Sequence, residues 1–145
     1  MLRDTVVTLN EQLVARFGGP PGIRDSGLLE SALSRPQNQF AYGNATLFDL
    51  AAGHAFGIVM DHPFVDGNKR TGFIVAALFI ELNGYSFSAS EADTVVRTLA
   101  LAAGESSEAD YAAWLKANSK RRRTIRNAAL RWDPSARRGW RAGAS

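Results

Sequence analysis

Two strongly apolar stretches separated by a short polar loop constrain this chain more than any other feature. Residues 46–61 open with Thr46 and, three residues later, Asp49, a pairing that resembles the capping box of a helix start. Residues 68–82 are apolar nearly all round, which predicts a central buried helix rather than a surface one. Asn83-Gly84 supplies the stop of that second helix. The middle of the chain therefore predicts a helical core.

The flanking segments also favour helices. Residues 4–16 have apolar side chains at roughly helical spacing, and a second helix is predicted from Asp25 or Ser26 to the Arg35-Pro36 step. No segment shows sustained alternation of the β type. We therefore expect an all-α fold with at most a small hairpin near residues 36–45. Two later helix starts are predicted from capping pairs, Ser90 with Asp93 and Ser107 with Asp110.

Charge divides the chain in two. Residues 1–117 hold 8 Lys and Arg against 13 Asp and Glu, a net charge of −5, whereas residues 118–145 hold 9 against 1, a net charge of +8. The length suits one domain, so we expect one folded domain at residues 1–117 and a basic extension at 118–145. The extension either contacts an anionic partner or forms a last helix and a frayed tail. The residues of that helix would be Ile125, Ala128, Ala129 and Trp132.

Composition excludes several classes of protein. There is no cysteine and there are only two histidines, so neither a disulfide framework nor a thiolate zinc site is available. The N-terminus has no apolar run long enough for a signal peptide or a membrane span. A cytoplasmic protein without a membrane partner is the expectation.

The loop at residues 62–70, His-Pro-Phe-Val-Asp-Gly-Asn-Lys-Arg, is too polar for a simple connection. A helix begins near Gly67 and Asn68, so its first backbone N–H groups lack helical partners and favour an anion. Lys69 and Arg70 add full positive charges there, and a guanidinium group can hold phosphate oxygens bidentately. These groups predict a site for a nucleotide di- or triphosphate.

Two further groups of the loop suit phosphoryl or nucleotidyl transfer. Asp66 can bind a hard cation such as Mg²⁺ through one carboxylate, with phosphate oxygens as further ligands. His62 can accept a proton from a hydroxyl nucleophile near neutral pH. Each residue alone more often ends a helix or makes a turn, but their joint occurrence favours catalysis. Phe64 is expected to anchor the loop in the core, and His54 to be a packed core histidine.

This loop resembles the motif of the Fic family, which begins His-x-Phe-x-Asp/Glu-Gly-Asn. The flanking sequence is similar to the death-on-curing (Doc) branch of that family. The resemblance covers roughly residues 1–117 and includes four flanking blocks, residues 17–25, 27–33, 35–37 and 82–85.

The resemblance implies a Fic/Doc helical bundle that uses ATP and Mg²⁺. His62 would be the general base and Asp66 the Mg²⁺ ligand. Arg70 would be the third catalytic residue, and the nucleotide would be bound by Gly67, Asn68, Lys69 and Arg70. Residues 36–45 would form a flap that aligns the target segment.

Two departures indicate the subtype. AMP-transferring members usually have Gly at the position of Lys69 and a second Arg at the position of Phe73. Doc toxins share the features seen here, and are thought to transfer the γ-phosphate of ATP to a threonine of elongation factor Tu, which stops translation. The resemblance therefore implies a phosphotransferase toxin, with AMP transfer to protein hydroxyls as the alternative.

Control of such a toxin is expected in trans. A self-inhibiting motif of the family has its nearest match at residues 26–30, but Ser31 follows it, and helix capping explains this segment better. The resemblance therefore implies a Phd-type antitoxin whose disordered tail folds on the toxin.

A non-enzymatic alternative is a nucleic-acid-binding or regulatory module that uses the basic tail. Arginines interleaved with Trp132 and Trp140 can contact phosphates and stack on bases. Nucleic acid is therefore an alternative partner, though not the expected one.

Overall fold

The computed structural model describes residues 2–122, and within them the regular elements are helices apart from one small sheet. The helix predicted at residues 4–16 is confirmed as the first helix, and the capping pairs at Thr46, Ser90 and Ser107 are confirmed by hydrogen bonds. The elements are α1 (Arg3–Phe17), α2 (Ser26–Tyr42), α3 (Leu47–Asp61), α4 (Asn68–Leu82), β1 (Tyr85–Phe87), α5 (Glu91–Ala102), α6 (Glu108–Ala117) and β2 (Ser119–Arg121). The all-α prediction is confirmed.

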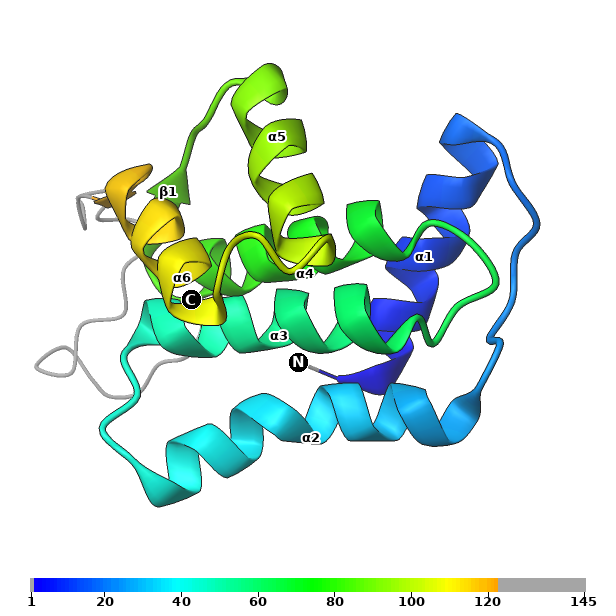
Figure 1. Cartoon of the computed structure of the whole chain (residues 1–145), viewed down its shortest axis with the longest axis horizontal. Coiled ribbons are helices and arrows are strands. Elements are labelled where there is room, and N and C mark those ends of the chain that lie inside the picture. Colours follow the sequence, from blue (N-terminus) through cyan, green and yellow to red (C-terminus); the bar gives the residue numbers. More distant parts are fainter. Residues whose placement is uncertain (1, 123–145) are drawn as a thin grey trace, which may run out of the picture.

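Helix α3 lies at the centre of the described bundle, with α2 along one side and α4 along the other (Figure 1). Its residues are apolar on every face, and nine of them are buried. Helix α4, predicted as the central helix, is buried along the face that packs on α3, whereas Leu82 near its end is 68% exposed. The connection between these two helices carries the candidate site, so the site rests on the most deeply packed pair.

Two hydrophobic clusters support the bundle. One cluster joins α3 and α4 to α6 through residues that include Ile80, Tyr111 and Trp114. The other joins α1 and α2 to the loop after α3, where Phe64 is 1% exposed. Because the second cluster includes the loop itself, the N-terminal helices help to fix the site.

The hairpin expected near residues 36–45 does not form, because α2 continues through Pro36 to Tyr42. Pro36 is buried, and tertiary contacts hold the helix on both sides of it. Arg35 and Gln39 both donate hydrogen bonds to the carboxylate of Glu108 on α6, and the Arg35 guanidinium lies 4.5 Å from the ring centre of Phe56. These contacts outweigh the local preference of proline for ending a helix.

The sheet pairs segments that are far apart in the sequence. Strand β1 is antiparallel to β2, with Tyr85 opposite Arg121 and Phe87 opposite Ser119. Arg122 follows the sheet and donates a hydrogen bond to the carbonyl oxygen of Tyr85, 2.7 Å away. The first basic residues after 118 therefore lie against the body. The expected last helix at residues 125–132 lies outside the described residues, and the division at 117/118 stays a prediction.

Among residues 2–122, no helix is long and apolar enough to cross a membrane.

Candidate active site

The loop between α3 and α4 is anchored by the ring and the backbone of Phe64. The Asn68 side chain accepts a hydrogen bond from the Phe64 N–H and donates one to its carbonyl oxygen, both at 3.0 Å. The anchoring role predicted for Phe64 is therefore confirmed. His62, Asp66, Lys69 and Arg70 are exposed around this buried anchor.

His62 ends α3 in a left-handed conformation, with φ 52° and ψ 56°. It is the only non-glycine residue with positive φ in the described chain. Such a conformation is costly for a residue with a Cβ atom and is often found at functional sites. Its placement turns the chain out of α3 and leaves the imidazole exposed beside the start of α4.

The N-terminus of α4 is open to an anion. Its first turn follows Gly67, which has φ 78° and offers no side-chain acceptor to the helix amides. The backbone conformation favours glycine, and a Cβ atom at this position would also be crowded, 3.1 Å from Val14 Cγ1. Lys69 and Arg70 lie in this first turn. Helices α2, α3, α5 and α6, in contrast, are capped by the side chains of Asp25, Thr46, Ser90 and Ser107.

Asn10, on α1, supports the start of α4 through two hydrogen bonds. Its side chain is 1% exposed, and its amide nitrogen donates to the Asp66 carbonyl oxygen at 2.9 Å and to Thr71 Oγ1 at 3.1 Å. A polar residue inside the apolar pattern of α1 is only a weak indication of this role. Asn10 thus connects α1 to both sides of the Gly67 turn.

The Asp66 carboxylate lies against the turn that follows α1. Its Oδ1 accepts the Gly67 N–H at 2.8 Å. A Cβ atom at Gly19 would lie only 2.2 Å from Asp66 Oδ2, so the carboxylate packs directly on the backbone of that glycine. Gly19 is a second residue whose role the sequence did not indicate.

A magnesium ion fits this donor set only with help from a ligand. Within residues 2–122, no three His, Cys, Asp or Glu side chains are grouped so as to hold a metal. Asp66 supplies a single carboxylate, which is the usual protein contribution where Mg²⁺ is bound together with nucleotide phosphates and water. The residues present are therefore compatible with an ion that arrives with its nucleotide.

Two open cavities meet beside Lys69. The larger, about 620 Å³, is lined by His62, Lys69 and Glu105 together with one face of α5. The smaller, about 250 Å³, is lined by Lys69, Arg70, Phe73 and the neighbouring face of α5. The structure thus gathers His62, Lys69 and Arg70 around neighbouring cavities, whereas Asp66 lies on the Gly19 side of the loop.

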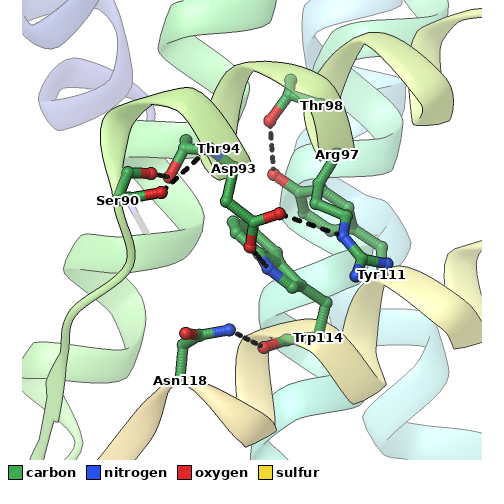
Figure 2. A network of polar contacts seen from close by, with 8 residues as sticks. All are labelled: Ser90, Asp93, Thr94, Arg97, Thr98, Tyr111, Trp114 and Asn118. Atoms are coloured by element: carbon green, nitrogen blue, oxygen red, sulfur yellow. Dashed lines mark hydrogen bonds and ion pairs between the residues drawn. The ribbon is translucent and has the colours of Figure 1, made fainter.

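A polar network holds the α5 wall of these cavities on α6 (Figure 2). Trp114 Nε1 donates to Asp93 Oδ2 at 2.7 Å, and the hydroxyl groups of Thr98 and Tyr111 lie 2.9 Å apart. Burial raises the pKa of Tyr111 to about 12, so its hydroxyl keeps its proton at neutral pH. These two contacts join α5 to α6.

Arg70 is stacked on an aromatic ring. Its guanidinium carbon lies 4.3 Å from the ring centre of Phe17, which is 52% exposed at the end of α1. A guanidinium group that stacks on an aromatic face is held in place, and the N–H donors at its edge can still bind a ligand. Phe17 therefore orients the arginine expected to hold phosphate, a role that the sequence did not indicate.

His54 is a core residue, as predicted. It is 3% exposed, and its ring centre lies 4.9 Å from that of Phe79. Burial lowers the pKa of His54 to about 4, so this side chain is neutral in the fold at neutral pH. Of the two histidines, only His62 is placed to exchange a proton with a ligand.

Comparisons with known proteins identify the family of this chain. The model of the Fic/DOC family matches residues 2–80. The protein kinase doc of Escherichia phage P1 is 35% identical over 82 residues, which cover 56% of this chain and 65% of that protein. The toxin Doc of Mycolicibacterium smegmatis is 41% identical over 76 residues, which cover 50% of this chain and 58% of that protein. The aligned segment thus spans less than two thirds of either relative. On the family match, this chain belongs to the Fic/DOC family.

Proposed function

We propose that this protein is the toxin of a toxin–antitoxin module and transfers a phosphoryl group from ATP to a hydroxyl group of a translation protein. Elongation factor Tu is the expected target. The observation that carries the proposal is the uncapped N-terminus of α4, with Lys69 and Arg70 in its first turn and His62 on the same cavity wall. The names of the two relatives, a protein kinase and a toxin, support it.

Each residue of the loop has a role in the proposed reaction. The amides of the first α4 turn, including those of Asn68 and Lys69, and the Arg70 guanidinium hold the phosphates. His62 takes the proton from the target hydroxyl, whose oxygen then forms a bond to the terminal phosphorus as ADP leaves. Asp66 would hold Mg²⁺, which when bound neutralises charge on the phosphates.

Phosphoryl transfer is favoured over AMP transfer by the surroundings of Phe73. This position would carry a second phosphate-binding arginine in an AMP-transferring relative. Here the partly buried ring of Phe73 lies 5.7 Å from that of Phe87 and 6.4 Å from that of Trp114, so it packs against the hydrophobic cluster of α3, α4 and α6. Lys69 in turn occupies the junction of the two cavities. AMP transfer is the alternative.

Labelled ATP distinguishes these two reactions. The protein is incubated with a bacterial extract, and with purified elongation factor Tu, in the presence of either γ-labelled or α-labelled ATP. We expect protein-bound label from the γ position only. Label from the α position alone would replace the kinase proposal with AMP transfer, and mass spectrometry of the target would report the added group.

Substitutions in the candidate site test whether its residues are responsible for the transfer of label. His62→Ala should lower transfer by about 10²–10⁴-fold and relieve growth inhibition while the fold is kept. Arg70→Ala should weaken nucleotide binding as well as the rate. Arg97→Ala is the matched control, because Arg97 is an exposed arginine on α5 whose ion pair with Asp93 spans one helical turn. Unchanged toxicity of His62→Ala would remove this residue from the mechanism.

The proposed regulator is a Phd-type antitoxin. Val95, Val96 and Leu99 on α5 are 50%, 62% and 50% exposed and line the cavities beside Lys69. An apolar face next to a cation suits a partner segment with apolar and acidic side chains. Val96→Asp should weaken neutralisation by the antitoxin in a growth assay, whereas a wild-type response would exclude this face. The proposed place of action is the cytoplasm, where translation factors work.

Nucleic-acid binding is the weaker candidate. Two arginines of the basic cluster are engaged with the body, since Arg121 lies 5.4 Å from the ring centre of Tyr85 and Arg122 pairs with Glu81 at 3.3 Å. Binding through phosphates predicts a steep loss of affinity with salt. DNA or RNA affinity that hardly changes between low and high salt would count against this candidate.

A further inference from the structure

The segment before α2 runs along the catalytic loop as a short backbone clamp. Ile23 and Phe64 form an antiparallel bridge, and the Val65 N–H donates to the Gly22 carbonyl oxygen at 3.0 Å. The N–H groups of Arg24 and Asp25 both donate to the Pro63 carbonyl oxygen, at 2.7 and 3.1 Å. Residues 22–25 thus fix the backbone of residues 63–65, directly after His62.

The Arg24 side chain extends this clamp to the end of α3. Its Nε donates to the His62 carbonyl oxygen at 2.7 Å, and one terminal nitrogen donates to the Asp61 carbonyl oxygen at 2.9 Å. Carbonyl groups in the last turn of a helix have no helical donors, and the negative end of the helix dipole favours a cation there. One planar guanidinium group satisfies two adjacent carbonyl groups.

The conformation of His62 explains why such a support is needed. A left-handed residue at a helix end is usually glycine, which has no Cβ atom. Here an imidazole is required at the same position, so the surroundings must hold the unfavourable backbone. The carbonyl group that Arg24 binds belongs to this residue, and its orientation follows directly from the φ and ψ angles of His62.

We propose that Arg24 is a positioning residue for His62. It holds the His62 backbone in the left-handed conformation and thereby sets the imidazole at the wall of the larger cavity, beside Lys69. The catalytic half of this inference rests on the proposed function, in which His62 is the general base. The alternative is that Arg24 only stabilises the end of α3, in which case it affects unfolding but not the geometry or the turnover of the folded protein.

Nuclear magnetic resonance tests the geometry without any substrate. Backbone chemical shifts and the HN–Hα coupling of His62 report its φ angle in the wild type, in Arg24→Ala and in Arg24→Lys. We expect both variants to move the φ angle of His62 away from positive values. The change should be smaller for lysine, which keeps the positive charge but cannot bind both carbonyl groups with one planar group. Arg3→Ala is the matched control, because Arg3 is a partly exposed arginine that pairs with Glu30 and is expected to leave His62 unchanged. Unchanged His62 signals in folded Arg24→Ala would overturn the proposal.

Enzyme kinetics test whether the position of His62 affects catalysis. In the γ-label assay, Arg24→Ala should lower kcat by about tenfold or more, because a small misplacement of a reacting group is costly. The KM for ATP should change by less than about twofold, because the phosphate-binding groups at the start of α4 are unchanged in this variant. A shifted His62 with wild-type kcat would overturn the catalytic half.

The outcomes separate this inference from the proposed function. If the wild-type protein transfers no label from ATP, the proposed function fails, whereas the resonance experiment still decides whether Arg24 holds His62. If His62→Ala is inactive and Arg24→Ala is fully active, the catalytic half of the inference fails and the proposed function stands. Should Arg24→Ala not fold, Arg24→Lys provides both measurements.

Discussion

Removal of the Asn10 amide should destabilise the fold and the site together. Asn10 lies in the core of the α1–α4 contact and donates to one buried hydroxyl, that of Thr71, and to the backbone carbonyl of Asp66. Asn10→Ala removes both hydrogen bonds and leaves a small cavity next to Gly67. Asn10→Asp keeps nearly the same volume but, when ionised, has no donors, so it removes the hydrogen bonds without creating a cavity.

The expected size of the effect follows from these contacts. Each lost hydrogen bond costs about 0.5–1.5 kcal/mol, and a buried acceptor left without a donor raises this cost. We therefore expect Asn10→Ala to lower the free energy of unfolding by about 2–4 kcal/mol. Asn10→Asp should cost at least as much at neutral pH, because it buries a charge. Urea denaturation followed by circular dichroism measures both values, with m-values compared to confirm two-state behaviour.

A neighbouring residue supplies the control for Asn10. Gln12 carries an amide side chain on the same helix and is exposed, so Gln12→Ala should change the free energy of unfolding by less than about 0.5 kcal/mol. If Asn10→Ala were no more destabilising than Gln12→Ala, the two hydrogen bonds would not hold the helix start. The transfer rate should fall with Asn10→Ala even at temperatures where the variant is fully folded, because the Asp66 backbone loses its support.

Three further predictions follow from other parts of the structure. Burial lowers the pKa of His54 from 6.5 to about 4, so below about pH 6.5 the unfolded chain binds a proton that the fold does not. The contribution of His54 to the free energy of unfolding is therefore complete above pH 6.5 and should fall by about 2 kcal/mol by pH 5. His54→Phe should remove this pH dependence, which denaturation curves at several pH values would measure. Gly19→Ala should lower transfer at least about tenfold, because its Cβ atom would displace the Asp66 carboxylate. Unaltered kinetics would contradict this. Asp93→Ala leaves the Trp114 N–H without its acceptor and should cost about 1–3 kcal/mol, measured by thermal unfolding and tryptophan fluorescence.

The helices and the local structure of the candidate site could be predicted from local sequence. Apolar periodicity and the capping pairs at Thr46, Ser90 and Ser107 act over three or four residues, so they remain visible in the linear chain. The composition of residues 62–70 also predicted a helix-start anion site. The structure confirms that Gly67 leaves the α4 amides without a side-chain cap. The chemical roles of the loop residues stay predictions.

The contacts that hold this loop in place come from residues far away in the sequence. Asn10, Gly19 and Arg24 are remote from the loop in sequence, and their contacts appear only when α1 and the segment before α2 pack against it. The continuation of α2 through Pro36 and the pairing of β1 with β2 are likewise decided by partners far along the chain. Local patterns carry no information on such distant partners. The local sequence therefore sets which groups the loop between α3 and α4 presents, whereas tertiary packing sets the backbone conformation that orients them.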